Sequence, residues 1–151
     1  MEINDLNARV IGACIEIHRT LGPGLLESAY EECICHELRL AGLSFERQKP
    51  LPVAYKDVKL DCGYRLDVVV ENMLLVELKS VEALAPIHEA QVLTYLKLSG
   101  LTVGMLINFN VPVLRRGINR VVNHYDETSE SGSGILQNES KDIKRASWFD
   151  A

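Results

Sequence analysis

Residues 64–80, YRLDVVVENMLLVELKS, alternate in a way that fixes how two strands must pair. A strand sends successive side chains to opposite faces, so the residues that share the apolar face set the register of a hairpin. The apolar face is formed by Tyr64, Leu66, Val68 and Val70 in the first strand and by Leu74, Val76 and Leu78 in the second. These sets align if the turn centres on Asn72, so that paired residue numbers add up to 144, as 70 and 74 do.

The same register brings four charged residues together on the second face. Asp67 is predicted opposite Glu77, and Arg65 opposite Lys79. Two carboxylates with Cβ atoms roughly 5 Å apart shift each other's pKa unless a cation lies between them. The pattern therefore indicates either a site for a divalent metal or a solvated outer face whose charges keep a sheet edge from aggregating.

Composition is typical of a soluble globular domain, with 151 residues, 47% hydrophobic and 25% charged. We expect one domain over residues 1–125 and a disordered tail over residues 126–151, which are rich in Ser, Gly and acids. No run approaches the ~20 apolar residues that cross a bilayer, and no basic region precedes an apolar one at the start. We therefore expect a cytoplasmic protein without a membrane partner.

Four cysteines and the net charge exclude some classes of site. Cys14, Cys33, Cys35 and Cys62 form no CxxC pair, so we expect small buried side chains and neither a zinc site nor a disulfide framework. The net charge of −5 argues against a broad basic surface for nucleic acid. A local patch combined with a bound metal can still hold a polyanion. The sequence leaves homo-oligomerisation open.

Hydrophobic periodicity predicts the remaining elements. Apolar residues at spacings of three and four indicate helices over residues 3–20 and 25–41. Period-two segments over 51–55 and 58–63 precede the hairpin. A helix of about fifteen residues follows, with Pro86 in its first turn and Gly100 after its end. The apolar run at 101–109 is typical of a buried strand that runs parallel to the strand before the helix.

The predicted order is thus α-α-β-β-β-β-α-β, an α/β (α+β) chain with a mixed sheet flanked by helices. In that order, Asp67 followed by Glu77-Leu78-Lys79 resembles the D…(D/E)xK signature of the PD-(D/E)XK nuclease superfamily, with Leu66 where the name has proline. Gly24, Glu27 and Tyr30 spell G-x-x-E-x-x-Y, and residues 3–124 resemble the small bacterial family named for this GxxExxY motif. The resemblance implies a restriction-endonuclease-like core.

The resemblance also implies a metal site. Asp67, Glu77 and the carbonyl of Leu78 would be ligands of Mg²⁺, with Mn²⁺ as a substitute, and Glu27 would reach the same ion, often through water. Lys79 would orient the attacking water or stabilise the charged transition state. Asp67, Glu77, Lys79 and Glu27 are therefore the expected catalytic residues. We expect them in one cleft with Glu27 at its rim.

Three further residues are expected to bind substrate. Gln91 and Tyr95, four apart on one helix face, resemble the Q-x-x-x-Y element that holds phosphate or a metal-bound water, with Gln91 at the rim of the cleft. Tyr95 as an ordinary core aromatic is the alternative. Arg65 is expected to contact phosphate or to form a surface salt bridge with one of the carboxylates.

The implied activity is cleavage of nucleic acid, DNA rather than RNA. Two other interpretations remain at this point. One is a binding or interaction module that keeps the nuclease fold without cleaving. The other is a structural protein with a charged sheet face.

Overall fold

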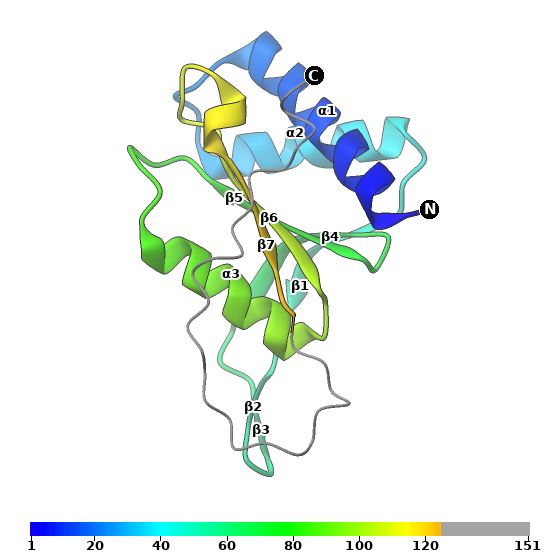
Figure 1. The fold of residues 1–151 in the computed structure, drawn as a ribbon, viewed down its shortest axis with the longest axis vertical. Coiled ribbons are helices and arrows are strands. Elements are labelled where there is room, and N and C mark those ends of the chain that lie inside the picture. The colour runs from blue at the N-terminus through cyan, green and yellow to red at the C-terminus, as the bar shows by residue number, and fades with distance from the viewer. Residues whose placement is uncertain (125–151) are drawn as a thin grey trace.

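The computed structural model describes residues 1–124 as a sheet between two helical layers (Figure 1). The predicted tail, residues 126–151, lies outside the described residues. The helices are α1 (Ile3–Leu21), α2 (Glu27–Leu40) and α3 (Pro86–Ser99). The strands are β1 (Phe45–Pro50), β2 (Val53–Tyr55), β3 (Val58–Leu60), β4 (Arg65–Val70), β5 (Leu74–Lys79), β6 (Val103–Asn108) and β7 (Ile118–Val122), and a 3-10 turn, η1 (Leu114–Gly117), precedes β7.

The main sheet has the strand order β1-β4-β5-β6-β7. Strands β5 and β6 run parallel, and the other neighbours run antiparallel. Strands β2 and β3 form a separate hairpin that projects away from α1 and α2 (Figure 1). A mixed sheet with helices on both faces confirms the predicted fold class, including the parallel pair joined by α3.

Strands β1 and β7 are absent from the predicted order. Strand β1, FERQKP, is mostly polar and alternates between half-buried and exposed side chains, because it is the edge strand beside β4. Strand β7 is a short edge strand on the opposite side. A mostly polar strand and a strand of only five residues both give weak hydrophobic signals, which explains both omissions.

The predicted hairpin register is confirmed, because Val68 pairs with Val76 and Val70 with Leu74. The predicted facing of Leu66 is wrong. Leu66 packs in the cluster beneath α3, whereas Val68 and Val70 pack beneath α1 and α2. The change of face occurs where Gln48, on neighbouring β1, has a positive φ of 51°. Such a backbone conformation interrupts the regular alternation of side chains.

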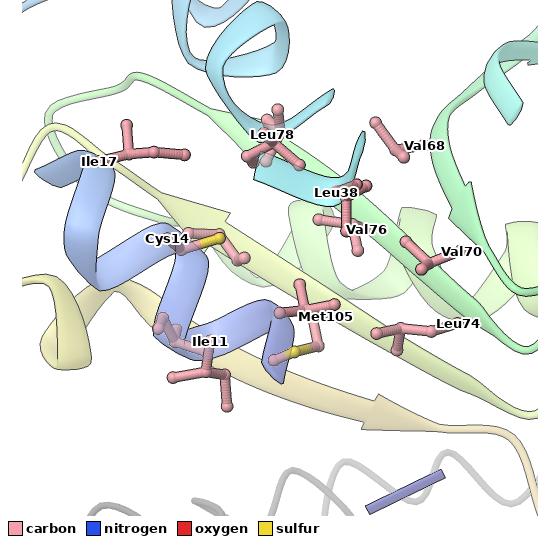
Figure 2. Close-up of a cluster of buried hydrophobic side chains, with 14 of the residues drawn as sticks. Ile11, Cys14, Ile17, Leu38, Val68, Val70, Leu74, Val76, Leu78 and Met105 are labelled. Atoms are coloured by element: carbon pink, nitrogen blue, oxygen red, sulfur yellow. The ribbon is translucent and has the colours of Figure 1, made fainter. Parts of the chain in front are cut away.

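Two apolar clusters hold the layers together. The larger cluster joins α1 and α2 to one face of the sheet, and Figure 2 shows Ile11, Cys14 and Ile17 of α1 facing Met105 and the β5 side chains. The smaller cluster joins α3 to the other face. Strand β6 is buried along its whole length, as predicted.

The cysteines are mostly buried. Cys14 and Cys35 are buried and Cys33 is half-buried, but Cys62 is exposed, because it lies in the loop before β4 rather than on a strand. Within residues 1–124, no helix combines the length and apolar character that a membrane crossing requires.

Candidate functional site

Asp67 and Glu77 meet where the pairing of β4 and β5 ends. The paired residues of this hairpin run from Val70–Leu74 to Val68–Val76. One step further, the Asp67 amide donates to Glu77 Oε1 at 3.0 Å, and the Leu78 amide donates to Asp67 Oδ2 at 2.9 Å. The two carboxylates therefore act as acceptors for main-chain amides, which would otherwise need other partners.

Glu77 is buried, with 5% of its surface exposed. Burial and then the negative charge of Asp67 raise the pKa of Glu77 to about 9, while the nearby charge of Lys79 lowers that pKa. Without an added cation, Glu77 therefore keeps a proton at neutral pH. A buried acid in this state is typical of sites that bind cations or transfer protons.

A pocket of about 510 Å³ lies between the start of α2 and this end of the sheet. Its lining consists of Leu25, Leu26, Glu27, Ser28, Glu31, Gln48, Asp67, Leu78 and Ser80. Glu27 Oε1 accepts the Ser80 amide at 3.3 Å, and Ser80 Oγ donates to the Leu25 carbonyl at 2.6 Å. These bonds attach the first residue of α2 to the segment that follows β5.

A third carboxylate of this pocket, that of Glu31, was not predicted from the sequence. Glu31 accepts from the Gln48 amide group at 2.5 Å and from Arg47 Nε at 2.8 Å. Gln48 also donates to Asp67 Oδ1 at 3.4 Å, so it joins the two acids. One signal was present, because Glu31 follows Glu27 by one helical turn and shares its face.

Gln91 and Tyr95 lie on the α3 side of the sheet. Gln91 Nε2 donates to the Tyr95 hydroxyl at 3.0 Å, and the Tyr95 ring lies 6.1 Å from that of Tyr64. Burial and then the charge of Glu77 raise the pKa of Tyr95. Tyr95 also packs in the smaller apolar cluster, so it belongs to the core and also lies near Glu77 of the candidate site.

The pocket holds only some of the residues expected in the cleft. Asp67 and Leu78 line the pocket, whereas Glu77, Lys79 and Gln91 do not. The reason is alternation along β5, which sends Leu78 towards α2 and its neighbours Glu77 and Lys79 towards α3. The carboxylates of Asp67 and Glu77 still meet across the main chain.

Arg65 and Lys79 are not paired in the sheet. Arg65 is exposed and lies opposite Pro50 of β1, and it forms no ion pair within residues 1–124. The salt bridge considered for Arg65 is therefore not formed in this part of the chain. Lys79 is half-buried and lies beside Asn108 of β6.

Asp67 and Glu77 fit a hard divalent cation. Mg²⁺ usually takes one or two carboxylates and keeps several waters, so two acids suffice. A cation between them would offset the effects of burial and of the Asp67 charge on the pKa of Glu77. Within residues 1–124, no cluster of three or more His, Cys, Asp and Glu side chains is placed to bind a metal, and Glu27 instead accepts the Ser80 amide.

Comparison with known proteins gives one match. The model of the PD-(D/E)XK nuclease superfamily matches residues 4–121, which include every residue of the site described above. No curated protein matches the chain, and no solved structure matches it.

Proposed function

The chain belongs to the PD-(D/E)XK nuclease superfamily, and on this premise we propose that it is a Mg²⁺-dependent nuclease that hydrolyses phosphodiester bonds, with DNA as the preferred substrate. Nucleases of this superfamily generally use divalent metals. One observation carries the proposal: the carboxylates of Asp67 and Glu77 meet at the end of a strand pairing, with the charge of Lys79 acting on Glu77.

In this proposal Asp67, Glu77 and the carbonyl of Leu78 hold the ion, and Mn²⁺ can take its place. When bound, the ion supplies neutralisation of charge on the phosphate oxygens and a lower pKa for water. Lys79 orients the attacking water or stabilises the extra negative charge of the transition state. Glu27 holds water at the rim of the pocket, where its carboxylate already accepts an amide.

The substrate-binding roles are also proposals. Gln91 donates to the Tyr95 hydroxyl, whose pKa burial and the charge of Glu77 raise, and the amide and the hydroxyl can both donate to phosphate oxygens. Arg65 is exposed and carries a charge without an ion-pair partner in the described chain. It therefore suits a contact to the substrate backbone.

We propose that the chain belongs to the GxxExxY group within the superfamily, and the places of the motif residues support this proposal. Gly24 has a φ of 101°, which favours glycine. The Tyr30 hydroxyl donates to the Gly22 carbonyl at 2.6 Å and accepts the Leu25 amide at 3.1 Å. These bonds fix the connection that leads to Glu27, the motif acid at the pocket.

The test is cleavage that depends on Lys79. Wild type and Lys79→Ala are incubated with single- and double-stranded DNA and RNA in Mg²⁺, Mn²⁺, Ca²⁺ or EDTA. Lys97→Ala, which removes an exposed lysine of α3, is the matched control. We expect cleavage by wild type and the control in Mg²⁺ or Mn²⁺, and none by Lys79→Ala, which should still bind the ion because its lysine is not a ligand. Ca²⁺ should support binding better than cleavage.

A binding module without cleavage is the second candidate. The net charge of −5 favours it, because a polyanion is held largely by Lys and Arg. If wild type cleaves no substrate faster than Lys79→Ala while both bind Mg²⁺, the nuclease proposal fails for these substrates and the binding module replaces it.

A further inference from the structure

Two neighbouring arginines in η1 have exposed side chains. Arg115 and Arg116 form neither a side-chain hydrogen bond nor an ion pair within residues 1–124. By contrast, Arg9, Arg47 and Arg120 all donate to oxygen atoms of the protein. Two adjacent guanidinium groups repel each other, and an external anion can compensate for this repulsion.

The charge around this turn differs from that of the whole chain. Residues 109–124, which include the turn and strand β7, contain no Asp or Glu, whereas the chain as a whole has a net charge of −5. The same stretch contains three arginines, Arg115, Arg116 and Arg120. A segment of one sign attracts a polyanion locally even when the total charge is unfavourable.

The turn lies at the same end of the strands as the candidate site. Lys79 pairs with Asn108 across strands β5 and β6. Gly117, directly after the arginines, packs so closely on Asn108 that an added Cβ would collide with the Asn108 carbonyl oxygen. Figure 1 shows η1 beside the end of α1, which leads into the connection containing pocket residue Leu25. The arginines are therefore close in the fold to the strand ends that carry Lys79 and the pocket.

The turn is also fixed to its surroundings. Asn108 Oδ1 accepts the Val81 amide at 3.1 Å and the Asn110 amide at 3.2 Å. A hydrogen bond of 2.8 Å joins His18 Nε2 of α1 to the Val111 carbonyl. Leu114, the first residue of η1, is buried in the larger cluster. A fixed turn loses little entropy when its side chains bind a ligand.

We infer that Arg115 and Arg116 bind the sugar–phosphate backbone of the nucleic acid next to the segment held at Asp67 and Glu77. The inference rests on the proposed function for the identity of the polyanion. Guanidinium groups suit this role, because each can donate two parallel hydrogen bonds to one phosphate. Such contacts position the substrate without reading its sequence.

The experiment measures binding in Ca²⁺ by fluorescence anisotropy, with a labelled 20-nucleotide DNA as single strand and as duplex. The full chain is compared with the double variants Arg115→Ala/Arg116→Ala and Arg115→Lys/Arg116→Lys. The control Lys59→Ala/Lys97→Ala removes the same charge from two exposed lysines of β3 and α3 that form no ion pair in the described chain. Each protein is titrated between 50 and 200 mM KCl.

The double alanine variant should bind roughly tenfold more weakly than wild type. The slope of log K against log[salt] should become shallower by about 1.8 for duplex and about 1.4 for single strand, since two phosphate contacts are lost. The double lysine variant should keep the wild-type slope, and the control should bind as wild type does. Melting temperatures should agree among all variants; if the alanine variant does not fold, Arg115→Gln/Arg116→Gln replaces it.

An unchanged affinity and slope for the double alanine variant would overturn the inference. An equal loss in the control would also overturn it, because general charge would then explain the effect. Either result leaves the nuclease proposal standing if cleavage depends on Lys79. Weaker binding by the arginine variant, together with no cleavage by wild type, would support the arginine contact and end the nuclease proposal.

Discussion

Glu77→Gln should stabilise the metal-free protein at neutral pH. In the folded protein, burial and then the charge of Asp67 raise the pKa of Glu77 from 4.5 to about 9. Between these two values the folded state keeps a proton that the unfolded chain releases. Stability from this group is therefore complete below pH 4.5 and is lost as pH rises to about 9. Glutamine resembles the protonated form and does not titrate.

The size of the effect follows from this shift in pKa. A pH of 7 lies about 2.5 units above the ordinary pKa of 4.5. At 1.36 kcal/mol per unit, Glu77 therefore lowers the free energy of unfolding at pH 7 by about 3 kcal/mol relative to its value below pH 4.5. Glutamine also keeps an oxygen that can accept the Asp67 amide. The melting temperature should rise by roughly 2–4 °C for each kcal/mol gained.

The assay is urea unfolding in EDTA from pH 5 to pH 9. Wild type should lose stability steadily over this range, and Glu77→Gln should lose much less. Glu82→Gln, which changes an exposed carboxyl in the loop after β5, is the control and should follow wild type. Equal slopes for wild type and Glu77→Gln would refute the reasoning, because Glu77 would then be ionised in the folded protein throughout.

Three other substitutions give distinct expectations. Asp67→Asn should be neutral or stabilising in EDTA, because it keeps an acceptor and removes a charge; a loss above ~2 kcal/mol in urea would assign Asp67 to the fold. Tyr30→Phe should cost about 1–2 kcal/mol by freeing two groups in residues 22–25, and an unchanged unfolding midpoint would contradict this. Asn7→Leu should stabilise by about 1 kcal/mol or more, since Asn7 is fully buried without a hydrogen-bond partner in the described chain; a lower melting temperature would argue against it.

Burial explains which parts of the fold could be predicted from the sequence. The hairpin register followed from alternation, because a one-residue slip would turn the apolar side chains of β5 towards the wrong layer. Helix α3 begins at Pro86 and ends before Gly100, which has a φ of 76° as a left-handed cap. Strand β1 could not be recognised because it is mostly polar and its partner β4 lies beyond the β2–β3 hairpin, and β7 could not because it contains only five residues.

The two acids of the candidate site could be predicted from the sequence, but the residues around them could not. Asp67 and Glu77 could be brought together because both lie on one hairpin. Glu31 and Gln48 meet through the packing of α2 against β1, which no local pattern encodes. Their contact also depends on the positive φ of Gln48, a conformation that few residues other than glycine adopt and that propensity does not predict.

The crossed hydrogen bonds at the end of β4 and β5 make amide hydrogen exchange a direct measure of metal binding. The amides of Asp67 and Leu78 donate to carboxylate oxygens that a metal ion would also use. Binding therefore competes with two hydrogen bonds of the protein, which lowers the affinity for the ion. Exchange at these two amides should become faster on addition of Mg²⁺, whereas amides in the core should become better protected as the folded state is stabilised.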